Sequence, residues 1–273
     1  LFGQQLRWEV VQVQSSFATC LDGLGRHSEA EALHREALAG ARQLFTEDHP
    51  FLAQACNDLA VSLMEQGEGA EARPLLDEAV AMFRRIFPGD HPIVSTALSN
   101  LAACLDLLGR SDLALPKHRD AVAMARRLGR DRLVSSTLNR LSTCLRYLDK
   151  HEEALEVLEE AVALASENVA DAALLAILRG NLASCYRALH GPKEALPLYL
   201  QALEECERLF PPDHPMVAHA LNGLAYCEED AGELEAACEH YEKALDIARR
   251  TGLADRHVFA SNLGYLWMHR RGE

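Results

Sequence analysis

Residues 57–67 read NDLAVSLMEQG, and closely similar stretches occur at residues 99–109 (SNLAACLDLLG) and 222–232 (NGLAYCEEDAG). Each stretch has leucine at its third position, a small residue after it and glycine at its end. The same apolar anchor position recurs seven times, at steps of 39 to 42 residues. These anchors are Phe17, Leu59, Leu101, Leu141, Leu182, Leu224 and Leu263. Such a regular period predicts a stacked array of repeated units.

Small residues occupy fixed places within the repeat. Alanine stands thirteen residues after each of the first six anchors, and again seven residues further on. The two columns are Ala30, Ala72, Ala114, Ala154, Ala195 and Ala237, and Ala37, Ala79, Ala121, Ala161, Ala202 and Ala244. Because bulky side chains would hold two helix backbones apart, these columns predict two closely packed helices in each unit.

A helix stop follows eight residues after each of the first six anchors. The residues there are Gly25, Gly67, Gly109, Asp149, His190 (followed by Gly191) and Gly232. Glycine suits the left-handed turn that ends many helices. We therefore expect first helices near 9–24, 52–66, 93–108, 133–148, 173–190, 216–231 and 256–271, and second helices near 27–45, 69–87, 111–128, 151–166, 193–210 and 234–250.

This column pattern resembles the tetratricopeptide repeat over essentially the whole chain. The phrase Asn57-Asp58-Leu59-Ala60, the linker Asp-His-Pro at 48–50, 90–92 and 213–215, and the period of about 42 residues are similar to the kinesin light chain subclass. The resemblance implies an all-α fold, a right-handed superhelical solenoid of helix hairpins.

We expect a single array over residues 1–273. Its units lie near 9–50, 51–92, 93–132, 133–172, 173–215 and 216–255, with a terminal helix at 256–271. The chain does not begin with methionine, and its last helix has no second helix after it. We therefore expect the array to be a fragment of a longer chain.

Composition limits the partners. The net charge is −14 and positive residues form no dense run, so nucleic acid is not an expected partner. The sequence has no stretch of about 18 apolar residues, so we expect no membrane insertion. Arginine outnumbers lysine 23 to 4, which favours a GC-rich bacterial source.

Five of the eight cysteines share one repeat column, three residues after the anchor. They are Cys20, Cys104, Cys144, Cys185 and Cys227. Because each of these five belongs to a different unit and no C-x-x-C pair occurs, we interpret the cysteines as small, reduced fillers in a cytoplasmic protein. We expect neither a metal nor a cofactor.

The motifs of common enzyme classes are absent from the sequence. It contains no phosphate loop, no H-E-x-x-H and no G-x-S-x-G, and no two histidines stand three or four residues apart on an expected helix. We therefore predict that this chain is not an enzyme. The Asp-His-Pro phrase is better explained as a helix start, because aspartate can cap the free N–H groups and proline suits the first turn. The predicted caps are Asp48, Asp90, Asp131, Asp171 and Asp213.

The first helices of tetratricopeptide arrays line the concave groove, so we expect partner-binding residues on their exposed columns. The candidates are Asn57, Asn139, Asn222, Thr143, Arg146, Arg187 and Tyr226. The resemblance to kinesin light chain grooves implies that the three asparagines contact a peptide backbone, which offers matching donors and acceptors. The alternative is that they satisfy neighbouring groups of this chain.

Two arginines in adjacent units, Arg146 and Arg187, suggest a site for a carboxylate or an acidic peptide segment. Arg140 and Tyr147 lie nearby in the sequence. The alternative is that these arginines pair with acidic residues of the same chain. Both alternatives stay open at the level of sequence.

The sequence thus favours a non-catalytic scaffold or adaptor that binds a peptide or protein segment in its groove. One alternative is a regulatory or sensor module of a larger bacterial signalling enzyme, such as a protease or a nucleotide-binding switch. Another, by family analogy alone, is a cytoskeletal cargo adaptor. No prediction of the oligomeric state follows.

Overall fold

The computed structural model describes residues 2–23, 26–167, 172–251, 253 and 256–271, which form thirteen α-helices and no strand. The first helices of the hairpins are α1 (Phe2–Gly23), α3 (Pro50–Glu65), α5 (Pro92–Leu107), α7 (Asp131–Tyr147), α9 (Ala172–His190), α11 (Pro215–Ala231) and α13 (Arg256–Arg271). The second helices are α2 (His27–Leu44), α4 (Gly69–Ile86), α6 (Ser111–Arg127), α8 (His151–Ser166), α10 (Pro192–Leu209) and α12 (Leu234–Thr251). The predicted all-α fold of helix hairpins is confirmed.

The helix boundaries lie within two residues of those predicted, with one exception. The first helix begins at Phe2 instead of near residue 9. Its extra length carries Trp8, which packs edge-on against Phe51 with ring centroids 4.6 Å apart. An aromatic contact to the next hairpin therefore accompanies this longer helix.

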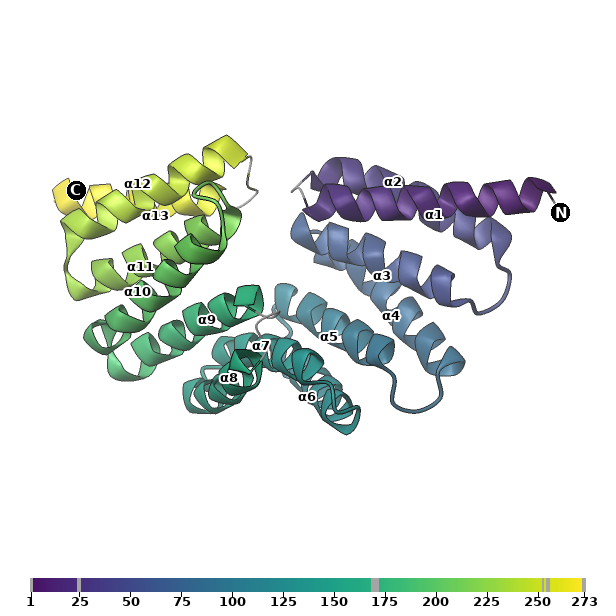
Figure 1. Cartoon of the computed structure of the whole chain (residues 1–273), viewed down its shortest axis with the longest axis horizontal. Helices are drawn as coiled ribbons and strands as arrows, with labels where there is room; N and C mark the ends of the chain where they lie inside the picture. The colour runs from purple at the N-terminus through teal and green to yellow at the C-terminus, as the bar shows by residue number, and fades with distance from the viewer. Residues whose placement is uncertain (1, 24–25, 168–171, 252, 254–255, 272–273) are drawn as a thin grey trace. The chain divides into compact units, whose positions relative to one another are not determined.

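The chain divides into two compact units, Leu1–Leu148 with helices α1 to α7 and Asp149–Glu273 with helices α8 to α13. The division falls between the two helices of the fourth repeat. Within each unit the helices follow one another as a stack of antiparallel pairs (Figure 1). A single continuous array over residues 1–273 stays a prediction.

The first helices lie closer to one another than the second helices do. In the first unit α1 contacts α3, α3 contacts α5 and α5 contacts α7, and in the second unit α9 contacts α11 and α11 contacts α13. Within the described part of either unit, no contact of that extent joins two second helices. The first helices therefore form the inner, concave side of each unit.

The alanine columns make this packing possible. Every member of both columns is buried, with an exposed fraction of 3% or less. The anchors Leu59, Leu101 and Leu224 are also buried. Leu182 is half-buried, and Phe17 is 56% exposed, because α1 has only α2 and α3 against it among the described helices.

The predicted helix stops adopt the left-handed backbone conformation. Gly67, Gly109, Gly191 and Gly232 have φ angles between +69° and +95°. Asp149 is the one non-glycine residue in the described chain with a positive φ, +55°. Gly25 lies outside the described residues.

The Asp-His-Pro linkers differ from the prediction, because histidine and not aspartate caps the helix. His49, His91 and His214 are the N-cap residues of α3, α5 and α11. In each, Nδ1 accepts a hydrogen bond from the backbone N–H two residues later, at 3.1 to 3.3 Å.

The prediction that Asp48, Asp90 and Asp213 are caps is therefore wrong. Asp131 is also not a cap, because it is the first helical residue of α7 and Arg130 is the N-cap residue. Asp171 lies outside the described residues.

Each capping histidine also stacks on the phenylalanine that follows the preceding helix. The ring centroids are 3.6 Å apart for Phe45 and His49, 4.0 Å for Phe87 and His91, and 4.2 Å for Phe210 and His214. Burial under these neighbours lowers the pKa of His49, which keeps the ring neutral and its Nδ1 able to accept. The histidine thus joins the end of one hairpin to the start of the next.

The linker aspartates instead form ion pairs with arginines near the end of the following second helix. Asp48 pairs with Arg85 at 2.8 Å, Asp90 with Arg127 at 2.7 Å, and Asp213 with Arg250 at 2.6 Å. The partner of each aspartate lies 37 residues later in the chain (85 − 48, 127 − 90 and 250 − 213). Each pair joins the start of a hairpin's first helix to the end of its second helix, so the antiparallel packing of these two helices brings the two charges together.

We predict that His91→Ala lowers the free energy of unfolding by about 1–2 kcal/mol, since it removes both a helix cap and an aromatic contact. The matched variant Asp90→Asn should have a much smaller effect, because its ion pair is exposed to solvent. Urea unfolding followed by circular dichroism measures both. A larger loss for Asp90→Asn than for His91→Ala would contradict this assignment.

We also predict that part of the stability is lost as the solution becomes acidic. The pKa of His49 is lower in the folded chain than its usual 6.5, so the unfolded chain takes up the proton first. The contribution is complete above pH 6.5 and declines as the pH falls below that value. In His49→Asn the cap does not titrate, and its melting temperature should fall less than that of the wild type between about pH 7.5 and about pH 5.5. Equal falls would argue against a neutral capping histidine.

Candidate functional site: a pocket on the first-helix side

A pocket of about 280 Å³ opens on the concave side of the first unit, among α3, α5 and α7. Its lining residues are Met64, Glu65, Ala103, Asp106, Leu107, His118, Arg140, Thr143 and Tyr147. All but His118, which comes from α6, belong to the three first helices. The pocket therefore lies on the side lined by the first helices.

The rim of the pocket is apolar and exposed. Leu107 is 48% exposed and Tyr147 is 65% exposed, and Met64 lies half-buried between the helices. Large apolar side chains that remain exposed beside a concavity are typical of binding sites. These walls suit an apolar side chain of a partner.

One cation faces this apolar rim. Desolvation by the pocket walls lowers the pKa of the Arg140 guanidinium, and the nearby Glu65 carboxylate opposes that shift. Arginine stays charged at any ordinary pH, and Arg140 makes no ion pair within the described chain. A partly desolvated cation without an ion-pair partner favours the approach of an anionic group.

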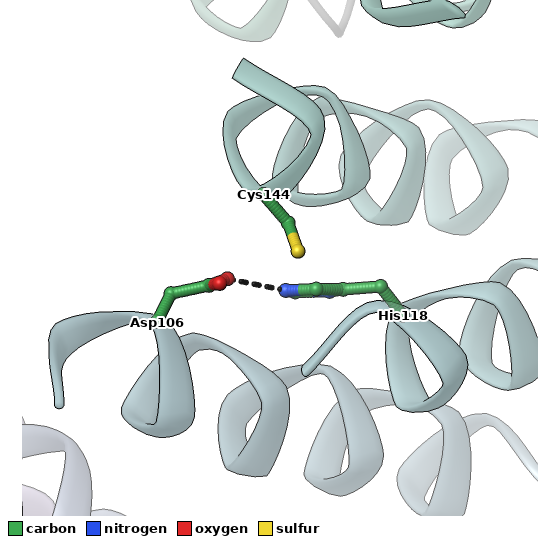
Figure 2. Close-up of side chains that lie close together, drawn as sticks. All are labelled: Asp106, His118 and Cys144. Atoms are coloured by element: carbon green, nitrogen blue, oxygen red, sulfur yellow. Dashed lines mark hydrogen bonds and ion pairs between the residues drawn. The ribbon is translucent and has the colours of Figure 1, made fainter. Parts of the chain in front are cut away.

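The floor of the pocket is polar and closed. His118 Nε2 lies 2.9 Å from Asp106 Oδ2, and both side chains are buried (Figure 2). The floor therefore sets the depth of the pocket, and its polar atoms are shielded from bulk water.

Of the predicted site residues in the first unit, Thr143 lines the pocket. Its hydroxyl donates to the backbone carbonyl of Asn139 at 3.3 Å. Asn139 and Arg146 lie half-buried on the same helix, outside the lining. The structure thus brings one of these three predicted residues into the pocket, together with Arg140 and Tyr147.

Asn57 has an internal role. Its side chain is 7% exposed, its Oδ1 accepts a hydrogen bond from Asn100 Nδ2 at 2.9 Å, and its Nδ2 donates to Asp58 at 3.3 Å. In the second unit, Asn222 Oδ1 accepts from Asn262 Nδ2 in the same way, at 3.0 Å. These bonds link successive first helices. Contact of the asparagines with a peptide stays a prediction.

Arg187 and Tyr226 lie together in the second unit. The Arg187 guanidinium stands 4.4 Å from the centre of the Tyr226 ring and forms an ion pair with Asp230. Burial acts to lower the pKa of Arg187, but Tyr199 and Asp230 outweigh it and raise that pKa. Arg187 is therefore paired within its own chain. Arg146 belongs to the first unit, and a joint carboxylate site of the two arginines stays a prediction.

Sequence reasoning missed a set of polar pairs spaced twelve residues apart. In each pair, the first residue lies on the first helix, five residues after the anchor. Its partner lies on the second helix of the same hairpin, seventeen residues after the anchor. The pairs are Asp22 with His34 at 3.0 Å, Asp106 with His118 at 2.9 Å, and Glu229 with Tyr241 at 2.9 Å. The sequence contained a signal for these pairs, because each repeat with an acidic residue five after the anchor has histidine or tyrosine seventeen after it.

A second concavity, of about 380 Å³, lies in the second unit among α10, α11 and α12. Its lining includes Asp213 and Arg250, which already neutralise each other. None of the eight cysteines forms a disulfide in the described part of the chain, and Cys20 is exposed while the other seven are buried. No helix in the described part of the chain is long and apolar enough to cross a lipid bilayer.

The comparison with protein families agrees with this architecture. A tetratricopeptide repeat model matches residues 52–127 and 172–250, and two further models of that repeat match residues 12–51 and 95–209. The chain belongs to the tetratricopeptide repeat family. A comparison with curated protein sequences found no significant match.

Solved structures share the fold at low sequence identity. The tetratricopeptide-like repeats of a putative kinesin light chain from Podosopora anserina are 23% identical, with a TM-score of 0.57, over 75% of this chain and 99% of that one. NprR in complex with its cognate peptide NprX is 18% identical, with a TM-score of 0.71, over 98% and 72%. A signal transduction ATPase with a tetratricopeptide repeat sensor from Pyrococcus horikoshii is 16% identical, with a TM-score of 0.65, over 98% and 43%.

We predict that Asn57→Ala lowers the free energy of unfolding by about 1–3 kcal/mol, because it leaves the buried Asn100 amide without its acceptor. Asn57→Ala combined with Asn100→Ala should cost less than the sum of the two single changes. Chemical denaturation of the four proteins in this cycle measures the coupling. Strict additivity would show that the bond contributes nothing.

Proposed function

We propose that this chain is a non-catalytic binding module that holds a peptide or a protein segment on its first-helix side. The observation that carries the proposal is the pocket among α3, α5 and α7, where exposed Leu107 and Tyr147 flank Arg140. Apolar walls with a few oriented polar groups are the usual composition of a ligand site.

The chemistry of the pocket favours one kind of occupant. An apolar side chain would fill the space between Leu107 and Tyr147, and a neighbouring carboxylate would reach Arg140. Thr143 offers a hydroxyl at the same wall, and Arg146 provides a further cation one turn along α7. The partner is therefore a segment with apolar and acidic residues side by side.

The second unit offers an aromatic surface on its first helices. Tyr226 and Tyr265 are 43% and 54% exposed, in the same repeat column of α11 and α13. Tyrosine is enriched among the residues that dominate binding energy at interfaces. These rings are a separate candidate contact surface within the second unit. The likeness to NprR, a protein solved with its cognate peptide, supports a peptide as the ligand class.

A second candidate is a sensor module within a larger signalling protein. It is favoured by the likeness to the signal transduction ATPase, where the similar region is 43% of the chain and the repeats are described as a sensor. A cargo adaptor, the third candidate, rests on the likeness to kinesin light chain repeats. For all three we propose a bacterial cytoplasmic setting, on the arginine-rich composition and the cysteines that form no disulfide in the described chain.

Binding to an array of short peptides that combine apolar and acidic residues tests the proposal. Arg140→Ala and Tyr147→Ala should each weaken the strongest interactions about tenfold or more, because arginine and tyrosine of this kind are typical hot spots. Both residues are exposed, so the melting temperature should change little.

The matched control is Arg84→Ala, an exposed arginine on the second helix α4 that should leave peptide binding unchanged. Peptides with lysine in place of the acidic residues should bind poorly. Unchanged affinity in both pocket variants, or an equal loss in Arg84→Ala, would remove the pocket from the proposal.

A further inference from the structure

Three side chains with metal-binding atoms converge at the floor of the first unit. Asp106 comes from α5, His118 from α6 and Cys144 from α7 (Figure 2). One ligand atom from each lies within 4.8 Å of the other two. The side chains of Asp106 and His118 are 7% and 1% exposed, and Cys144 is fully buried.

This cluster is polar but incompletely satisfied. Asp106 Oδ2 faces His118 Nε2, whereas Asp106 Oδ1 and His118 Nδ1 are buried without a hydrogen-bond partner within the described chain. A carboxylate taken out of water with one oxygen unpaired is costly. A cation among the three side chains would offset that cost.

The first repeat contains the same arrangement in a satisfied form. Asp22 and His34 occupy the columns of Asp106 and His118, at 3.0 Å, and Ser62 occupies the column of Cys144. The Ser62 hydroxyl donates to Asp22 Oδ1 at 3.0 Å. In the third repeat the corresponding thiol lies 3.6 Å from the Ser111 carbonyl, and the aspartate oxygen is left unpaired. Sulfur in place of oxygen thus changes the chemistry of an otherwise repeated cluster.

We propose that Asp106, His118 and Cys144 bind a divalent metal ion of the zinc class. Thiolate, imidazole and carboxylate are the ligands that Zn²⁺ takes in proteins. Two of them are anionic and one is neutral, so the ion's charge is matched in a buried setting. On binding, the Cys144 thiol releases its proton to solvent, and the His118 ring carries its hydrogen on Nδ1 so that Nε2 can coordinate.

The spacing fits this assignment. Zinc bonds of about 2.0–2.3 Å in a tetrahedron place ligand atoms about 3.3–3.8 Å from one another. The observed distances bracket that range: Asp106 Oδ2 and His118 Nε2 are 2.9 Å apart, and all three ligand atoms of the cluster lie within 4.8 Å of one another. Three protein ligands leave a fourth position for water. Because Asp106 and His118 also line the pocket, that position lies at the pocket floor.

Cobalt(II) is the probe, because a bound thiolate gives it a near-ultraviolet charge-transfer band and tetrahedral ligands give it visible bands. The whole chain, stripped of metal and kept reduced, is titrated with Co²⁺ and then with Zn²⁺. We expect one Co²⁺ per chain, a charge-transfer band, and displacement by Zn²⁺.

Cys144→Ser recreates the hydroxyl of the first repeat, and it should lose the charge-transfer band and bind Co²⁺ at least about tenfold more weakly. Cys104→Ser is the matched control. Cys104 shares the column and lies 3.3 Å from the Gly69 carbonyl, but Met64 and Leu76 stand where Asp106 and His118 stand in the next repeat. It should keep the band.

A wild-type chain without the charge-transfer band, or identical spectra for the two serine variants, would overturn the proposal. If Cys144→Ser does not fold, as judged by circular dichroism, Asp106→Asn carries the test. That variant keeps the thiol and should bind Co²⁺ more weakly, so unchanged affinity would also overturn it. Peptide binding is not needed for any of these measurements, so their failure leaves the proposed function untouched.

Discussion

The close approach of the two helices in each hairpin is the constraint on which the rest of the structure depends. Alanine at two columns of the second helix lets the backbones come together, and none of these side chains retains appreciable exposure. Ala114 and Ala121 bracket His118 on α6, and Ala102 lies one turn before Asp106 on α5. A bulkier residue at any of these positions would separate the helices and break the Asp106–His118 contact.

This closeness also governs the charge of the concave side. Water is excluded between the helices of a hairpin, so a polar side chain placed there must find a partner across it. Asp22, Glu229 and Arg187 all do so. The charged groups that stay available to another molecule are those without such a partner, of which Arg140 is the clearest case. Local pairing, more than the net charge of −14, therefore sets which charges this side presents.

The period predicted the helices well, because a repeated apolar and small-residue pattern is written along the local sequence. The caps were not predictable in the same way. Aspartate is the better cap in isolation, but Asp48 pairs with Arg85 at the end of α4, and His49 caps α3 instead. Alignment of the repeats could have predicted the Asp106–His118 pair, because the two residues hold fixed positions relative to the anchor. The position of Cys144 near this pair depends on how one hairpin packs against the next, which could not be predicted from the sequence.

The ion pairs between linker aspartates and arginines have a genetic consequence. The aspartate and the arginine of each ion pair are 37 residues apart, which is less than one repeat of about 42 residues. A duplicated or deleted segment that starts in a linker and is one repeat long therefore contains both residues of an ion pair. The histidine and the phenylalanine on which it stacks are closer still, four positions apart in the sequence. Unequal recombination between repeats would thus lengthen or shorten the chain without leaving an unmatched charge at the join. Arrays with this linker can therefore gain or lose whole repeats while each remaining hairpin keeps its aspartate–arginine ion pair.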